Sequence, residues 1–223
     1  MSEKKDGSMR LFYNGVFDEN NAKNRGRYFG EIGIKYEDVI TAYLINGTNI
    51  EIIENNKEKV IPKTDALVTR KKGIYLSATA ADCIPVLFYE TKFKIIGIAH
   101  SGWRGTVSEI AKKTIGKIIE LGGKTENIVV AMGPGINRCH FEINDDILDD
   151  FANYQEFVEK REGKYFADLK GIIKKQLLEA GIKEENVENN NDCTFCNEDK
   201  YYSYRREKVK NSGLMITLIG LTE

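Results

Sequence analysis

The sequence predicts a single α/β domain in which short, mostly buried strands and several helices share one core. Three observations support this class. At 223 residues the chain can bury one sizeable core and is short for two. Short apolar runs rich in β-branched and aromatic residues, typical of strands, occur beside segments with the apolar spacing of helices. No internal repeat, low-complexity stretch or linker divides the chain.

Composition narrows the classes of function. The chain has 33 basic and 34 acidic residues without a long block of one sign, which indicates neither a nucleic-acid nor a membrane partner. No apolar run approaches the roughly 18 residues of a spanning helix. The first residues lack the apolar core of a signal peptide, so we expect a cytoplasmic protein. We expect a small-molecule substrate, and nothing in the sequence sets an oligomeric state.

The N-terminal part begins with polar sequence. We expect residues 1–9 to be a disordered lead-in and residues 10–223 to form the domain. Arg10–Tyr13 fits a short strand, and Asn20–Phe29 fits a polar helix. Arg25 lies on this helix, where an arginine is ordinarily solvated.

The next segments predict further strands. Asp38–Ile45 and Asn49–Ile53 are strand-like and flank an Asn-Gly turn signal, so we expect a β-hairpin. Thr64–Thr69 and Gly73–Ala78 supply more strand material.

Two buried strands, Ile84–Tyr89 and Ile95–Ala99, follow. Cys83 opens the first and His100 closes the second. A tight turn between them sets Cys83 opposite His100, and opposite residues on antiparallel strands share a face with Cα atoms roughly 4.5 to 5.5 Å apart. A thiol and an imidazole so placed form either an activated nucleophile or two ligands of one metal ion. Pro85 is the residue at which this register could slip.

A glycine-lined turn comes directly after His100. Gly102 precedes Trp103 and Arg104, and Thr106 with Glu109 makes a capping-box pattern ahead of an amphipathic helix. Free N–H groups at a helix start, beside an arginine, favour a bound anion. We therefore expect thiol, imidazole and anion site to share one corner.

The C-terminal half predicts two strands, Ile128–Met132 and Leu214–Leu221, and two helices, Asp145–Phe157 and Asp168–Ala180. His140 follows a Gly-Pro-Gly turn, where it is either a loop histidine or a member of the site.

Cys193 and Cys196 form a lone Cys-x-x-Cys pair. A closed zinc site needs four ligands. Outside the expected site the only other thiol is Cys139, and we expect its neighbour His140 to point elsewhere. A metal or redox role for the pair is therefore disfavoured, and the sequence leaves the role of Cys193 and Cys196 open. The following stretch, Tyr201–Arg206, interleaves aromatic residues with two arginines, which is typical of either a pocket lining or a half-buried strand.

Several motifs together, in order and spacing, resemble one family over nearly the whole chain. They are Thr64–Thr69, Ala81–Cys83, Ala99–Gly105, Gly133–Ile136 and Cys193–Arg206. The sequence resembles the YlmD/YfiH/LACC1 family, whose members have been described as multicopper polyphenol oxidases (laccases) and as zinc-dependent purine nucleoside phosphorylases with adenosine deaminase and methylthioadenosine phosphorylase activity. The resemblance implies an α/β (α+β) sandwich of mixed β-sheets flanked by helices, similar also to cysteine hydrolases.

The resemblance also implies a metal site. The family's ligands are two histidines and a cysteine, which fall on Cys83, His100 and the position that Asn46 occupies here. The implied cofactor is zinc, with either Asn46 or His140 as its third ligand. Copper-dependent phenol oxidation is disfavoured, because multicopper sites need many histidines and the chain has two.

The leading hypothesis is a purine nucleoside phosphorylase-like enzyme, with a purine nucleoside as substrate and phosphate as co-substrate. Its catalytic candidates are Cys83, His100 and Asp82. Its substrate-binding candidates are Asn46, Arg25, Gly102, Trp103, Arg104, Arg205 and Arg206. The alternatives are a metal-independent cysteine hydrolase or deamidase, with Cys83 as nucleophile, and a nucleotide-binding pseudoenzyme.

Overall fold

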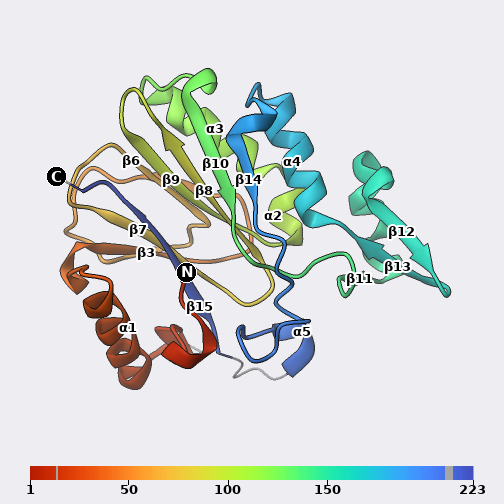
Figure 1. The fold of residues 1–223 in the computed structure, drawn as a ribbon, viewed down its shortest axis with the longest axis horizontal. Helices are drawn as coiled ribbons and strands as arrows, with labels where there is room; N and C mark the ends of the chain where they lie inside the picture. Colours follow the sequence, from red (N-terminus) through yellow and green to blue (C-terminus); the bar gives the residue numbers. More distant parts are fainter. Residues whose placement is uncertain (14, 209–212, 223) are drawn as a thin grey trace.

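Two mixed sheets form the body of the molecule in the computed structural model, which describes residues 1–13, 15–208 and 213–222 (Figure 1). The larger sheet contains, in spatial order, β14 (Val187–Asn189), β10 (Ile128–Met132), β8 (Ile84–Glu90), β9 (Ile95–Ser101), β6 (Ala66–Thr69) and β4 (Ile50–Ile52). The smaller sheet contains β15 (Met215–Gly220), β7 (Tyr75–Ala80), β3 (Val39–Tyr43) and β5 (Val60–Pro62).

Helices and two small sheets surround this body. The α-helices are α1 (Glu19–Glu31), α2 (Trp103–Val107), α3 (Ile110–Glu120), α4 (Leu169–Glu179) and α5 (Tyr204–Glu207). The 3₁₀ segments are η1 (Lys4–Asp6), η2 (Tyr36–Asp38), η3 (Thr125–Asn127), η4 (Asp145–Phe157) and η5 (Glu184–Asn186). The small sheets are formed by β1 (Phe12–Tyr13) with β2 (Val16–Phe17), and by β11 (Glu142–Ile143), β13 (Lys164–Ala167) and β12 (Val158–Arg161).

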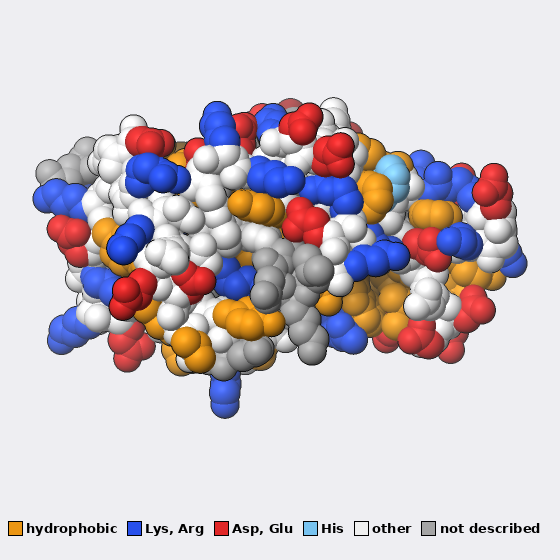
Figure 2. All heavy atoms as spheres, turned by 90° about the horizontal axis from the view of Figure 1, so that it is seen from below, with side chains coloured by type: hydrophobic (Ala, Val, Ile, Leu, Met, Phe, Trp, Pro, Cys, Tyr) orange, Lys and Arg blue, Asp and Glu red, His pale blue; other side chains and the backbone are white. Residues whose placement is uncertain are grey.

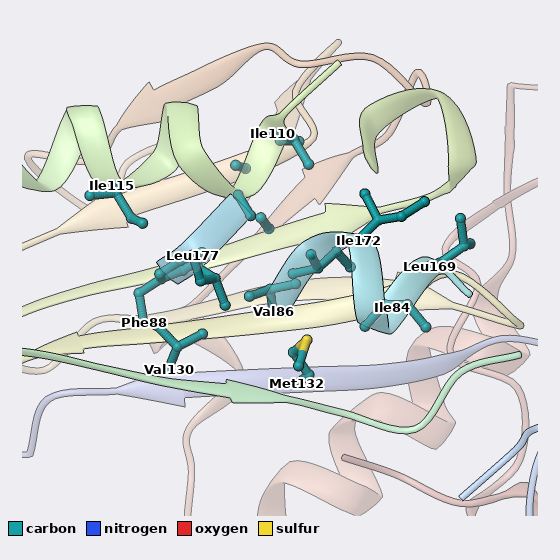
Figure 3. Close-up of a cluster of buried hydrophobic side chains, with 14 of the residues drawn as sticks. Ile84, Val86, Phe88, Ile110, Ile115, Val130, Met132, Leu169, Ile172 and Leu177 are labelled. Atoms are coloured by element: carbon teal, nitrogen blue, oxygen red, sulfur yellow. The ribbon is translucent and has the colours of Figure 1, made fainter. Parts of the chain in front are cut away.

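Helices α3 and α4 cover one face of the larger sheet (Figure 3). Ile110 and Ile115 of α3 pack there with Phe88 and Val86 of β8, all of them buried. The apolar spacing of α3 predicts this contact, because residues three and four positions apart share one side of a helix.

The two sheets pack against each other over a second apolar cluster. It contains Leu67, Ile96 and Ile98 of the larger sheet with Ile40 and Leu76 of the smaller one. The far side of the smaller sheet is covered by α1, whose Phe29 packs on Val39 and Ile216. The order of layers is therefore helices, sheet, sheet, helix (Figure 1).

The alternation of side chains along the strands places three candidate site residues between the sheets. The side chains that face the smaller sheet include Leu67 of β6, Leu87 of β8 and Ile98 of β9. Residues separated by an even number of positions along a strand share a face. Asp65, Cys83 and His100, at the ends of these strands, therefore point into the space between the two sheets.

The fold class is confirmed, but one predicted pairing is wrong. β3 and β4, expected as a hairpin about Asn46, lie in different sheets, and each pairs with parallel neighbours. Asn46 adopts a left-handed φ of 58°. Its backbone N–H donates to the Asp65 carboxylate instead of closing a hairpin turn. The side-chain acceptor thus outcompetes the local turn signal.

The register of β8 and β9 also differs from the prediction. His100 lies opposite Pro85, and Ile84 opposite Ser101, because four residues rather than two connect the strands. The shift keeps Cys83 and His100 on one face as diagonal neighbours. The predicted capping box is absent: α3 begins after Glu109, which has a left-handed φ of 62°, and Thr106 belongs to α2.

The prediction of a disordered segment at residues 1–9 is wrong. The Ser2 amide donates to the Ile216 carbonyl over 2.8 Å, and the Ile216 amide donates to Ser2 Oγ over 3.0 Å. Met9 is fully buried beside Phe29. Polar composition predicted disorder, whereas pairing with β15 gives this backbone the hydrogen bonds it needs.

The surface carries charges of both signs. Lys and Arg side chains alternate with Asp and Glu over the face in Figure 2, without a large area of one sign. Within the described ranges, no helix is both long and apolar enough to cross a bilayer.

Candidate active site

A cavity of about 680 Å³ opens at the edge where the two sheets and α2 meet, and its size suits a small organic ligand. The residues that line it include the aromatic side chains Phe12, Tyr43, Trp103, Phe141 and Tyr204, the arginines Arg10, Arg25, Arg104 and Arg205, and the predicted residues Asn46, Asp82, Cys83, His100 and Gly102.

Cys83, His100 and Asn46 converge on Gly102. A methyl group built on Gly102 would lie 3.0 Å from Cys83 Sγ, 3.5 Å from Asn46 Oδ1 and 3.6 Å from His100 Cε1. These three residues come from the chain before β8, the end of β9 and the loop after β3. Because Gly102 has no side chain, the space beside its Cα, which Cys83, His100 and Asn46 surround, stays open.

Asp65 organises this cluster from behind. Its Oδ1 accepts a hydrogen bond from the backbone N–H of Asn46 over 2.8 Å, and its Oδ2 accepts one from the backbone N–H of Gly47 over 2.9 Å. The same carboxylate lies 3.5 Å from His100 Nδ1, and both side chains are buried. Burial alone would raise the pKa of Asp65, but the nearby His100 ring and the hydrogen bonds from the two backbone amides outweigh it and lower the pKa.

His100 is shifted in the opposite direction. Burial alone would lower its pKa, but the interactions of the ring with Cys83 and with the Asp65 carboxylate outweigh burial and raise the pKa to about 9. Without a metal ion, the imidazole is therefore protonated at neutral pH and stands between a carboxylate and a sulfur.

The cluster fits zinc with two strong ligands and one weak one. A thiolate and an imidazole are ordinary zinc ligands, and the Asp65 contact with His100 Nδ1 leaves Nε2 for a metal, as in carboxylate–histidine–zinc arrangements. Asn46 presents Oδ1 at the same point, and a carboxamide oxygen is a poorer ligand than an imidazole nitrogen. We therefore expect zinc to bind here more weakly than at a site with a third strong ligand.

Three of the predicted arginines line the cavity. Arg25 is buried; its Nε donates to the Met9 carbonyl and its Nη1 to Thr41 Oγ1, and burial lowers its pKa to about 10. Arg104 stacks over the Trp103 ring at 4.2 Å. Arg205 donates to the Glu142 carbonyl over 2.8 Å.

Asp82 has a structural task. Its Oδ1 accepts the Thr194 hydroxyl and its Oδ2 accepts the Arg205 amide, each over 2.7 Å. It thereby fixes the start of α5 and the position of Arg205. Among the described residues that line the cavity, Asp82 is the single carboxylate. Its carboxylate is hydrogen-bonded to these two donors, and four arginines line the same cavity, so the electrostatic potential in the cavity is positive.

Two predicted residues lie elsewhere. Arg206 does not line the cavity: it donates to the carbonyls of Thr194, Phe195 and Tyr201 and so holds the loop before α5. His140, a candidate third ligand for the Cys83 site, instead lies against other cysteines, with its Nδ1 3.2 Å from Cys139 Sγ.

The sequence motifs contained Asp65 and Thr194 without giving either residue a role. A buried-strand aspartate and a threonine inside a Cys-x-x-Cys loop are signals that could have been noticed. Their partners are 18 to 112 positions away in sequence, so only the fold reveals what they do.

Comparison with known proteins shows which family the chain belongs to. Residues 13–222 match the family described as multi-copper polyphenol oxidoreductase laccase. A purine nucleoside phosphorylase of Deinococcus radiodurans is 33% identical over 202 residues, which cover 90% of this chain and 77% of the relative. Adenosine deaminase RL5, from an unknown prokaryotic organism, is 28% identical over 201 residues, which cover 84% of this chain and 76% of the relative.

The solved structure of YlmD from Geobacillus stearothermophilus superimposes with a TM-score of 0.89 at 27% identity, covering 97% of this chain and 85% of that one. YfiH from Bacillus licheniformis gives a TM-score of 0.89 at 26% identity, covering 96% and 86%. The chain therefore belongs to the multi-copper polyphenol oxidoreductase laccase family, in which relatives are named purine nucleoside phosphorylases.

Proposed function

We propose that this protein is a purine nucleoside phosphorylase-like enzyme acting in the cavity around Cys83 and His100. The observation that carries the proposal is the convergence of Cys83, His100 and Asn46 in one arginine-lined cavity of about 680 Å³. The names of the relatives support the same reaction class. Phosphate is the co-substrate, and a purine nucleoside is the substrate.

The cavity offers different surfaces to the two substrates. Arg104 and Arg205 provide bidentate donors for phosphate oxygens. The aromatic rings of Trp103 and Phe141 provide flat apolar surfaces for the purine and its ribose. Phosphate held by the arginines is positioned to attack the ribose C1′ carbon, and the glycosidic bond to the purine nitrogen breaks as the new C–O bond forms.

His100 handles the proton of this reaction in the metal-free site. With its pKa raised to about 9, the imidazolium can donate a proton to the departing purine nitrogen. Asp65 keeps the ring oriented through its Nδ1 contact. Zinc held by Cys83, His100 and Asn46 would supply a Lewis acid at the same point.

The direct test is phosphate dependence. Adenosine, inosine and methylthioadenosine are incubated with the protein, with and without inorganic phosphate, and the products are separated by chromatography. We expect free base and a pentose 1-phosphate only when phosphate is present. Release of base that does not respond to phosphate would contradict phosphorolysis.

The Cys83→Ala variant tests the position of the site. We expect it to fold, since Cys83 lies at the cavity rather than in either main apolar cluster, and to lose turnover by at least about 100-fold. Full turnover in a folded variant would place the reaction elsewhere.

Adenosine deamination is a second candidate, favoured by the relative named adenosine deaminase RL5. It is distinguished by its products, since deamination gives inosine and ammonia from adenosine without any need for phosphate. Cleavage of the glycosidic bond gives adenine instead. Assays of both products on one reaction mixture separate the two activities.

A further inference from the structure

Three cysteines and a histidine outside the cavity form a compact cluster. The ligand atoms of Cys139, His140, Cys193 and Cys196 all lie within 4.8 Å of one another. Cys139 Sγ is 3.7 Å from both Cys193 Sγ and Cys196 Sγ. His140 Nδ1 is 3.2 Å from Cys139 Sγ and 3.3 Å from Cys196 Sγ.

These spacings match a tetrahedral zinc site. With Zn–S bonds of about 2.3 Å and Zn–N bonds of about 2.0 Å, tetrahedral geometry places two sulfurs about 3.8 Å apart and a sulfur and a nitrogen about 3.5 Å apart. A disulfide needs an S–S distance of about 2.0 Å. All four cysteines of the chain are free thiols. The donor set, three thiolates and one imidazole, is a common set for structural zinc.

The ligands are held in place by their surroundings. Cys193 Sγ accepts the Asn137 amide over 3.4 Å and also receives backbone hydrogen bonds from Phe195 and Cys196. The His140 ring stacks on Phe195, with ring centres 4.0 Å apart and planes 15° apart. Amide donors stabilise the thiolate form of a cysteine, and a stacked imidazole keeps its nitrogen pointing in one direction. Both effects favour metal binding.

A neighbouring cation balances the charge. Zinc bound by three thiolates and a neutral imidazole carries a net charge of −1. Lys170 is 5% exposed, its Nζ donates to the carbonyls of Asn190 and Asp192, and Cys193, Asp168, Asp192 and Cys139 all contribute to its electrostatic environment. A buried lysine is costly unless anionic groups lie nearby, and a zinc–thiolate centre would add to the negative charge that the two aspartates supply.

We propose that Cys139, His140, Cys193 and Cys196 bind a structural zinc ion that is separate from the cavity around Cys83. Four protein ligands close the coordination shell, so this zinc supports the fold and has no open position for a substrate.

The site joins the two loops that form one wall of the cavity. β10 and β14 are parallel neighbours, so the loops that follow them leave the sheet at the same end. These loops touch through a bridge between Gly135 and Cys193, and the Thr194 amide donates to the Gly135 carbonyl over 3.0 Å. They lead to Phe141 and Arg205 at the cavity wall.

The test is the zinc content of the full-length protein by elemental analysis after exchange into metal-free buffer, compared between two matched cysteine variants. We expect Cys83→Ser to retain one zinc per chain and Cys139→Ser to lose that zinc. Cys139 is exposed, so its replacement by serine removes a ligand without opening the core. Zinc that Cys139→Ser retains in full, or a Cys83→Ser protein without zinc, would overturn the proposal.

Cobalt gives a second, spectroscopic readout. With Co²⁺ as the only metal, we expect the visible bands of tetrahedral cobalt and strong thiolate-to-cobalt charge transfer, weakened in Cys139→Ser and kept in Cys83→Ser. An octahedral spectrum would overturn the proposal. Neither measurement uses turnover, so a failure of the proposed phosphorolysis leaves this inference standing, and the reverse also holds.

Discussion

Asp65 is the side chain on which the candidate active site depends most. It accepts the amides of Asn46 and Gly47, and it faces His100. One buried carboxylate therefore sets both a loop from one sheet and an imidazole from the other. Removing it takes away the acceptor of two partly buried backbone amides, and unpaired amides of this kind destabilise the loop.

We expect Asp65→Asn to lower the free energy of unfolding by about 1–3 kcal/mol and to reduce turnover strongly, because it loses one amide acceptor and the negative charge facing His100. Urea unfolding and product assays measure both effects. Asp199→Asn, at an exposed position, is the matched control and should change stability by less than about 0.5 kcal/mol. An unfolding midpoint equal to that of the wild type would show that the carboxylate does not hold the loop.

The pH dependence of stability gives a separate test of Asp65. Its folded pKa lies below the ordinary value of 3.8. A depressed pKa contributes stability that is present above pH 3.8 and is lost as the pH falls through the folded value. We therefore expect the stability difference between wild type and Asp65→Asn to shrink below pH 3.8 in stepped urea titrations. A difference that stays constant in acid would argue against this linkage.

Asn46 offers a gain-of-function test. Its φ of 58° is a left-handed conformation in which asparagine and histidine are both enriched, so Asn46→His should be accommodated. A third imidazole or thiolate ligand strengthens a zinc site. We expect Asn46→His to bind zinc at the Cys83 site at least about tenfold more tightly. Competition with a chelator in a Cys139→Ser background measures this affinity, and Asn46→Ala should show no gain.

At the scale of elements, the site lies where β9 runs into α2. Thr106 Oγ1 donates to the Gly102 carbonyl over 2.9 Å, and Gln176 of α4 donates to the Thr106 carbonyl over 2.8 Å. α2 is thereby fixed to the neighbouring helix layer. The empty space at Gly102 is framed by rigid elements, so a side chain there has little room.

Two glycine-to-alanine changes should have opposite consequences. In Gly102→Ala the new methyl group would lie 3.0 Å from Cys83 Sγ, while the backbone φ of −73° tolerates any residue. We expect a folded protein with turnover reduced at least about tenfold and weaker zinc binding, because the methyl group occupies the point that the ligands face. Turnover equal to wild type would show that substrate does not approach this point.

Gly116→Ala is the matched control in a helix. Gly116 lies inside α3, and an added Cβ would meet no atom within 4 Å. Alanine in a helix interior is more stable than glycine by about 0.5–1 kcal/mol. We expect a higher thermal midpoint with unchanged turnover, measured by circular dichroism and the same product assay.

At the scale of the whole molecule, the N-terminal segment belongs to the core. Met9 is fully buried with Phe29 and Ile216, and its carbonyl accepts Arg25 Nε over 2.7 Å. The segment thus packs against α1 and holds the side chain of its Arg25 at the cavity wall.

We expect Met9→Ala to lower the free energy of unfolding by about 2–5 kcal/mol, because a fully buried side chain leaves a cavity. The backbone carbonyl that holds Arg25 is kept, so turnover should persist below the unfolding transition. Val16→Ala, at a side chain that is 70% exposed, is the control. Equal urea midpoints for the two variants would mean that the N-terminal segment is not part of the folded core.

Much of the fold could be predicted from local patterns. The strands around Cys83 and His100, the helix of Leu169–Glu179 and the last strand were all indicated by apolar runs and periodicity, which depend on neighbouring residues. The pairings were harder. Asn46-Gly47 is a strong hairpin signal, yet Asp65 takes the amides of the turn, and no local pattern shows that competition.

The sequence by itself determined the α/β class and the family, and it predicted that Cys83 and His100 share one face, because strand alternation and motif spacing depend on local sequence. The tertiary structure decided which distant groups meet. His140 joins Cys193 and Cys196, more than 50 positions away, because β10 and β14 lie side by side and their following loops leave the sheet at the same end. The order of strands in the sheet decides which loops meet, and this order depends on the packing of the whole core rather than on local sequence.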